Sequence, residues 1–293
     1  MIMAEETGGL EGYDLMKTRV ISSIVGIALL VLIVLSHKVF LGLAVSILAL
    51  IGLYEFYNAI TYAGYRPVKW IGYLSCVPLF LLGLDDFLNI QAAFNSAIFL
   101  SLFIFIIVVL LFITVIFNSS RCNPADIAFT VLGIMYIPFF SSFIILIRNL
   151  ENGIFLIWLI FLSAWATDTF AYFIGIKFGK RKITPVVSPN KTLEGSIAGT
   201  TACIIAILIY GLFLIERGHV TYLPLYGYGI LGAISSIMAQ IGDLAASSVK
   251  RYAKIKDYGK IMPGHGGVMD RVDSVLFAAP VVYFYISLIF LPK

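Results

Sequence analysis

The sequence predicts an all-α integral membrane protein with about nine transmembrane helices, a cytosolic N-terminus and a polar cavity at the cytosolic face of its C-terminal half. Three observations lead to this fold. The 293 residues are 60% hydrophobic and only 12% charged, about half the charge of a soluble domain. The apolar residues come in long runs, and Lys and Arg gather between alternate runs. This composition excludes a disordered chain, a nucleic-acid-binding protein and an ordinary water-soluble enzyme.

Each transmembrane helix is predicted from one apolar run, because crossing a bilayer as a helix takes about 20 apolar residues. Polar or turn-rich stretches separate the runs, of which the third is short and the fourth long. The runs lie at about 20–36, 39–57, 70–84, 92–117, 127–147, 154–176, 197–214, 226–249 and 274–291.

The chain divides into three parts. Residues 1–15 carry four acids and no base, and we expect a disordered leader or tag there. Residues 16–150 form the N-terminal transmembrane helices. Residues 151–293 form a C-terminal region with two polar loops, 177–196 and 250–273.

The orientation follows from the basic residues. Nine helices place the two termini on opposite sides of the membrane. If Lys17 and Arg19 are cytosolic, most Lys and Arg residues fall in cytosolic segments, which is the bias that membrane proteins show. The net charge of +4 is therefore expected to mark the cytosolic face, not a nucleic-acid partner.

Two acids lie at membrane depth near the cytosolic ends of their runs, Asp168 in the sixth and Asp243 in the eighth. An ionisable residue at this depth is costly unless it is paired or faces water, so a functional role is the first hypothesis. The alternative is a polar contact between helices.

Asp243 also begins a polar stripe. Four residues recur at helical spacing i, i+4, i+7 and i+11, namely Asp243, Ser247, Lys250 and Lys254. They share one helix face, and Arg251 flanks it. An acid beneath a hydroxyl and cations can hold a metal ion and the phosphates that the ion bridges.

The second loop contains the turn PGHGG at 263–267, which cannot be a helix interior. Glycines let main-chain N–H groups approach an anion closely. Asp270 and Asp273 follow, and their i, i+3 spacing places both carboxylates on one helix face. Capping of a helix N-terminus by acids is the alternative, and it explains one of the two.

Carboxylates, cations and a glycine turn together are the apparatus of phosphoryl or nucleotidyl transfer. The carboxylates are suited to Mg²⁺, as one or two ions. We expect one soluble phosphate substrate and one lipid substrate. A secondary transporter is the rival from another class, but its polar site belongs near the bilayer midplane.

The motif residues resemble one family. Residues 247–273, with SSVKR, KDYG and PGHGGVMDRVD, closely resemble the signature of phosphatidate cytidylyltransferases, the CDP-diacylglycerol synthases. Met262 departs conservatively from the family pattern. Residues 188–195, SPNKTLEG, are similar to a second family motif, whereas the N-terminal half offers little beyond its spans and Tyr54-Glu55.

This resemblance implies that the phosphate of phosphatidic acid attacks the α-phosphorus of CTP, giving CDP-diacylglycerol and pyrophosphate in a reaction that requires Mg²⁺. It also implies an inner-membrane enzyme whose active site faces the cytosol. The partners are CTP, phosphatidic acid and membrane lipids, with no nucleic acid and a possible homodimer. Another lipid phosphate, such as an ether lipid or a polyprenyl phosphate, stays open as the acceptor.

Site roles follow from the motifs and the resemblance. The expected catalytic residues are Asp243, Lys250, Arg251, His265, Asp270, Arg271 and Asp273. The expected metal ligands are Asp243, Asp270 and Asp273. The expected substrate-binding residues are Asp168, Ser188, Lys191, Glu194, Ser247, Lys256, Gly266 and Gly267. Glu194 is expected either to fix Lys191 or to serve as a further metal ligand.

Overall fold

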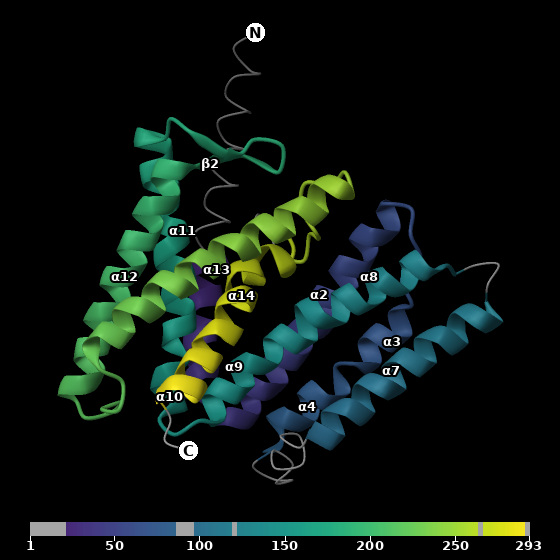
Figure 1. The fold of residues 1–293 in the computed structure, drawn as a ribbon, viewed down its shortest axis with the longest axis horizontal. Coiled ribbons are helices and arrows are strands. Elements are labelled where there is room, and N and C mark those ends of the chain that lie inside the picture. The colour runs from purple at the N-terminus through teal and green to yellow at the C-terminus, as the bar shows by residue number, and fades with distance from the viewer. Residues whose placement is uncertain (1–21, 86–96, 119–121, 263–265, 291–293) are drawn as a thin grey trace, which may run out of the picture.

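A computed structural model of the protein describes residues 22–85, 97–118, 122–262 and 266–290 (Figure 1). The predicted leader, 1–15, lies outside these ranges. The elements in chain order are a helix Ser22–Leu35, α2 (Lys38–Tyr62), α3 (Lys69–Leu74), α4 (Val77–Gly83), α7 (Ala97–Phe117), α8 (Pro124–Ile134), the π-helical η1 (Met135–Phe139), α9 (Phe140–Asn149), α10 (Gly153–Leu156), α11 (Trp158–Phe178), β1 (Lys182–Thr184), β2 (Ser188–Thr192), α12 (Leu193–Glu216), α13 (Leu225–Tyr252), α14 (Met269–Tyr285) and the π-helical η2 (Ile286–Phe290).

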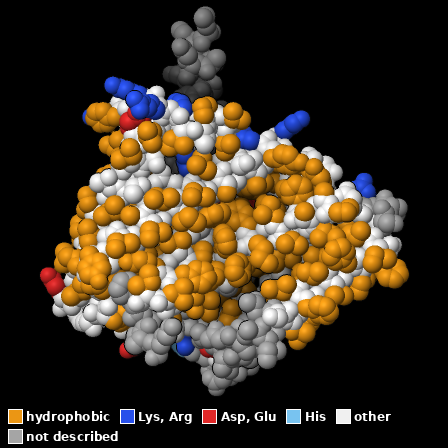
Figure 2. All heavy atoms as spheres, in the orientation of Figure 1, with side chains coloured by type: hydrophobic (Ala, Val, Ile, Leu, Met, Phe, Trp, Pro, Cys, Tyr) orange, Lys and Arg blue, Asp and Glu red, His pale blue; other side chains and the backbone are white. Residues whose placement is uncertain are grey.

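The prediction of a mostly helical membrane protein is confirmed. Among the described residues, six helical stretches are long and apolar enough to cross a membrane. They are Lys38–Tyr62, Pro124–Asn149, Gly153–Phe178, Leu193–Glu216, Leu225–Tyr252 and Met269–Ile289. The other three runs contain the shorter apolar helices Ser22–Leu35, Lys69–Gly83 and Ser101–Phe117. Figure 2 shows hydrophobic side chains over the middle of the visible face, as lipid contact requires.

Among the residues that the structure describes, the prediction of an all-α protein is wrong only within the expected loop 177–196, where β1 and β2 form an antiparallel hairpin that pairs Lys182 with Thr192 and Thr184 with Ser188. The segment is rich in β-branched residues, which favour extended backbone. Thr192 ends the hairpin and starts α12, because its hydroxyl accepts a hydrogen bond from Gly195 N at 3.2 Å. The hairpin is thereby joined directly to a long helix.

The N-terminal half packs around Tyr57 of α2. Its ring is fully buried, and its hydroxyl donates to Thr130 O of α8 at 2.9 Å. Gly72 of α3 and Gly133 of α8 lie against this ring so closely that neither position has space for a Cβ. One aromatic side chain therefore fixes the spacing of three helices.

The C-terminal half is a bundle of α11, α12, α13 and α14 with hydroxyl contacts inside it. Ser163 and Ser235 hydroxyls lie 2.8 Å apart, and Thr167 donates to Ser236 at 2.8 Å. α14 packs on α13 and also contacts α9 and α2 of the other half. The hairpin, the end of α13 and the start of α14 consequently lie at one end of the molecule (Figure 1).

The role of Tyr57 gives a stability prediction. In Gly133→Ala the new Cβ would lie 2.6 Å from the Tyr57 ring, and overpacking of this kind costs about 1–3 kcal/mol. We expect a lower midpoint of thermal unfolding in detergent. The matched control is Gly229→Ala in α13, where the nearest atom is 3.5 Å away and the midpoint should be kept. A Gly133→Ala protein as stable as the wild type would contradict this packing.

Candidate active site

A cavity of about 680 Å³ opens where the hairpin meets the ends of three helices. Its wall comes from the last turns of α11, from β1 and β2, from the start of α12 and from α13. Four residues that the sequence singled out line this cavity: Asp168, Ser188, Lys191 and Asp243. The structure therefore brings the first predicted loop and the polar end of α13 together.

A salt bridge within this cavity joins the hairpin to α13. Lys191 Nζ lies 2.6 Å from Asp243 Oδ2, and the same ammonium donates to Gln240 O at 3.4 Å. Both side chains keep partial exposure, 23% for Lys191 and 32% for Asp243. The expected phosphate cation and the expected metal ligand are therefore paired, and both remain accessible from the cavity.

Gln240 is a cavity residue that sequence reasoning missed. Its amide contacts the hydroxyls of Ser196 and Thr200, the latter at 3.1 Å. An uncharged amide inside an apolar run gave little reason to single it out. The available signal was the i, i+4 spacing of Ser196 and Thr200 on α12, which marks a polar stripe facing α13.

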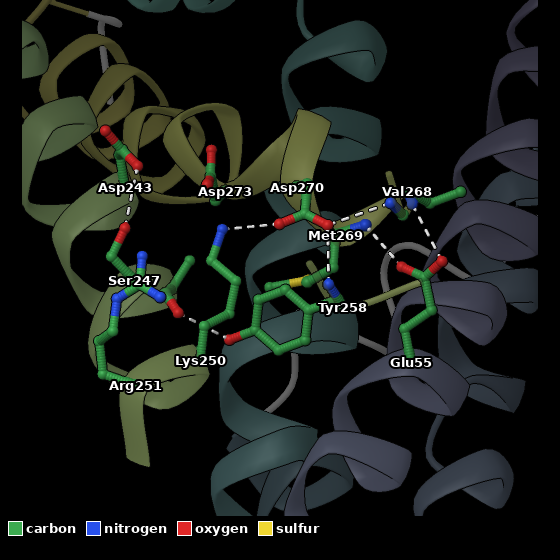
Figure 3. Close-up of polar contacts among 12 residues, drawn as sticks. Glu55, Asp243, Ser247, Lys250, Arg251, Tyr258, Val268, Met269, Asp270 and Asp273 are labelled. Carbon is green, nitrogen blue, oxygen red and sulfur yellow. Dashed lines mark hydrogen bonds and ion pairs between the residues drawn. The ribbon is translucent and has the colours of Figure 1, made fainter. Parts of the chain in front are cut away.

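A second cluster lies beside the cavity and is centred on Asp270 (Figure 3). Asp270 Oδ1 lies 2.6 Å from Lys250 Nζ. Its Oδ2 accepts hydrogen bonds from Tyr258 N at 2.8 Å and from Gly267 N at 3.0 Å. Both carboxylate oxygens are engaged and nearly buried. Asp270 thus binds main-chain N–H groups that lie before α14 and does not cap the helix itself, and it also pairs with Lys250.

The predicted loop 250–273 is shorter than expected. α13 continues through Tyr252, and α14 begins at Met269, so five of the catalytic residues expected within this loop lie on helices: Lys250, Arg251, Asp270, Arg271 and Asp273. The stripe on α13 stops before its last member, because Lys254 has a positive φ of 55° and lies beyond the helix.

Tyr258 supports the Asp270 cluster and was not singled out by sequence. Its hydroxyl donates to Ala246 O at 3.0 Å, and its ring centre lies 5.6 Å from Lys250 Nζ. Burial, and then the negative charges of Asp270 and Asp273, raise the pKa of Tyr258 well above its ordinary value. The phenol therefore stays protonated and keeps its hydrogen bond.

Ser274 connects the carboxylates of α11 and α14. Its hydroxyl donates to Asp168 Oδ2 at 3.1 Å, and its main-chain N–H donates to Asp273 Oδ1 at 2.7 Å. Asp273 repels Asp243 and Asp168 electrostatically. The hydroxyl of Ser247 lies 3.5 Å from Asp243 Oδ1. The cavity and the Asp270 cluster are thus two neighbouring parts of one acidic site.

The fit of this site to a metal ion can be tested on the carboxylates. Among the described residues, no three His, Cys, Asp or Glu side chains form a group able to hold a metal by themselves. Mg²⁺ commonly takes only one or two protein carboxylates and completes its shell with substrate phosphates and water. Asp243 fits that requirement because its side chain remains 32% exposed despite its contacts with Lys191 and Ser247. Asp273 fits as well, whereas Asp270 is only 7% exposed and both of its oxygens are engaged.

Other predicted residues have different surroundings. Glu194 Oε2 accepts from the main-chain N–H groups of Lys180 and Arg181, at 2.9 and 3.2 Å, and ties the start of the hairpin to α12. These two hydrogen bonds correspond to neither of the roles expected for Glu194, which were to fix Lys191 or to bind a metal ion. Arg251 Nε donates to Val187 O in the hairpin turn at 3.4 Å.

The remaining predicted residues differ in exposure and surroundings. Lys256 and Arg271 are exposed. Gly266 has a positive φ of 90°, which suits glycine, and a Cβ there would lie 3.1 Å from Asp270 Oδ2. His265 lies outside the described residues.

Glu55 is the acid that the sequence gave least reason to place here. It belongs to α2 and is 2% exposed. Its carboxylate accepts from Val268 N at 3.1 Å and from Met269 N at 2.8 Å, where α14 begins (Figure 3). The site is consequently built from both halves of the chain.

Comparison with known proteins identifies the family. The profile of the cytidylyltransferase family matches residues 17–289. A phosphatidate cytidylyltransferase of Bacillus subtilis (strain 168) is 36% identical over 186 residues, which is 63% of this chain and 67% of the relative. Relatives of the same name from Staphylococcus haemolyticus and Thermotoga maritima are 34% and 33% identical, over 91% and 92% of this chain and 97% and 96% of their own lengths. These matches confirm the resemblance seen in the motifs, and the chain belongs to the cytidylyltransferase family.

Proposed function

We propose that this membrane protein transfers the CMP moiety of CTP to phosphatidic acid, giving CDP-diacylglycerol and pyrophosphate. The relatives that match over most of the chain are named phosphatidate cytidylyltransferase. The structural observation that carries the proposal is the convergence of two lysine–carboxylate pairs, Lys191–Asp243 and Lys250–Asp270, at one end of a bundle of apolar helices. A phosphate compound and a lipid phosphate can meet at such a place.

The reaction needs positioning and charge neutralisation more than protein nucleophiles. A phosphate oxygen of the lipid forms a bond to the α-phosphorus of CTP, while the bond from that phosphorus to the β-phosphate oxygen breaks and pyrophosphate leaves. Lys191 and Lys250 are the cations placed to neutralise the phosphates. Their present carboxylate partners hold both ammonium groups in position.

Mg²⁺ is part of this proposal. Asp243 and Asp273 are the residues that would hold it, since Asp273 has few donors and repels its acidic neighbours. Bound there, the ion would neutralise phosphate charge and orient the triphosphate. Asp168, which lines the same cavity, is a further carboxyl group on the α11 side.

The proposed topology has nine transmembrane helices, a cytosolic N-terminus and an active site that faces the cytosol from the inner membrane. It is supported by the basic residues, many of which lie at the hairpin end on the visible face (Figure 2). It is also supported by the three shorter apolar helices, which add to the six long ones.

A radiolabelled CTP assay tests the function. Purified protein in mixed micelles should convert label into a lipid-soluble product only when phosphatidic acid and Mg²⁺ are both present, and EDTA should stop it. Parallel reactions with an ether-lipid phosphate and a polyprenyl phosphate test the acceptor. Incorporation that prefers one of these would move the assignment to that lipid, and a folded sample inactive with all of them would remove it.

Asp273→Asn tests the proposed metal position. The amide keeps the hydrogen bond from Ser274 N and removes repulsion from Asp243 and Asp168, so the fold should be retained. We expect turnover to fall about 100- to 1000-fold, the usual loss when one electrostatic contact to the reacting charge is removed. Glu216→Gln, at the exposed end of α12, is the matched control with unchanged turnover. Wild-type rates in Asp273→Asn would rule out this position.

Lys191→Ala tests the hairpin cation. Loss of a charge-assisted contact costs about 1.5–3 kcal/mol, so kcat/KM for CTP should fall roughly 10- to 100-fold. Lys180→Ala removes an exposed lysine just before the hairpin and serves as the control. If steady-state kinetics give the same kcat and KM for Lys191→Ala and the wild type, the hairpin carries topological charge only.

A further inference from the structure

Glu55 is a buried acid that the proposed reaction does not use. It is 2% exposed and belongs to a helix that could span a membrane, where an unpaired charge is costly. Its two oxygens accept hydrogen bonds from Val268 N and Met269 N. Since Glu55 is not among the described residues that line the cavity, its contacts and not its access to substrate indicate what it does.

The start of α14 needs an acceptor from elsewhere. The first N–H groups of any helix lack partners within the helix. Val268 precedes α14 and has no side chain able to cap it. Glu55 supplies the acceptor across the interface between the halves, and its negative charge also suits the positive end of the helix dipole.

Two glycines show that the loop is shaped around this carboxylate. Gly259 and Gly267 lie at opposite ends of the segment that joins Tyr258 to α14. A Cβ at Gly259 would overlap Glu55 Oε1, and one at Gly267 would lie 2.5 Å from Oε2. The loop therefore closes on Glu55 from two sides, with no space left for a larger residue.

The same loop holds the acidic cluster. Gly267 N, next to the amides bound by Glu55, donates to Asp270 Oδ2, and so does Tyr258 N. The other oxygen of Asp270 binds Lys250. A continuous path of short contacts thus leads from Glu55 through the loop amides to Asp270 and Lys250.

We propose that Glu55 is a positioning residue of the active site, which clamps the segment between α13 and α14 and so fixes Asp270 and Lys250 for phosphate handling. The inference rests on the proposed function. It gives the N-terminal half an indirect part in the reaction, although no described residue of that half lines the cavity.

The test compares Glu55→Gln with the wild type in detergent micelles. Gln keeps the size of the side chain but places an NH₂ group against a main-chain N–H. We expect kcat to fall about 100-fold, as a small misplacement in an active site does, with a smaller change in KM for CTP. Hydrogen exchange should quicken at the amides of Tyr258 and of 267–269, while α8 and α12 stay protected.

Tyr57→Phe is the matched control. It lies two residues along the same helix and removes a buried hydrogen bond, to Thr130 O, away from the loop. We expect it to lower the unfolding midpoint but to keep kcat within about twofold, with wild-type exchange in the loop. Wild-type kcat in folded Glu55→Gln, or unchanged loop exchange, would overturn the proposal. An equal loss of kcat in Tyr57→Phe would do the same.

Gly259→Ala decides the question if Glu55→Gln does not fold. It leaves Glu55 in place and forces the loop off its carboxylate, so the same loss of kcat and loop protection is expected. Gly229→Ala is its control. A folded Gly259→Ala protein with wild-type kcat would refute the clamp. If the wild-type protein is inactive toward phosphatidic acid, the proposed function is refuted instead. Hydrogen exchange at the loop amides would then still show whether Glu55 holds the loop in place.

Discussion

The cost of keeping ionised groups inside a bundle of membrane helices governs the arrangement of this site. Three acids of the site have a donor or a cation on another element: Asp243 pairs with Lys191 of the hairpin, Asp270 pairs with Lys250 of α13, and Glu55 accepts from the amides that begin α14. These pairings fix the hairpin to α13, α13 to α14, and α14 to α2. The polar contacts thus fix the relative positions of these elements more specifically than apolar packing alone would.

The carboxylates differ in how far they are neutralised. Asp270 has three N–H donors on its two oxygens, so it acts within the protein framework. Asp273 takes a main-chain N–H of its own helix and repels Asp168 and Asp243. The excess negative charge is therefore concentrated between the cavity and the Asp270 cluster. A bound cation would neutralise this negative charge. The number of donors on each carboxylate thus distinguishes structural acids from reactive acids better than their positions in the motifs do.

Hydropathy was sufficient to predict the long helices, because apolar runs of bilayer length have few alternatives to helix. The motifs were sufficient to predict that Lys191, Asp243, Lys250 and Asp270 would belong to one site. The hairpin was missed because charges in 177–196 suggested a simple loop and masked its β-branched residues. Glu55 could not be placed from the sequence, since its partners are main-chain amides, which carry no residue-specific signal. Asp270 shows a different limit of sequence reasoning. An acid at this position can bind nearby main-chain amides or a metal ion, and its spacing from Asp273 does not distinguish the two roles.

The clamp also has a consequence for biosynthesis. Glu55 and the amide of Val268 are 213 residues apart in the chain, and α14 is the last long helix that the structure describes. A chain emerging from the ribosome inserts α2 early and must hold its buried carboxylate without these donors until α14 arrives. The Glu55 contacts therefore cannot form before Val268 and Met269 have been synthesised. With the role proposed for Glu55, activity would begin only after α2 and the start of α14 have met.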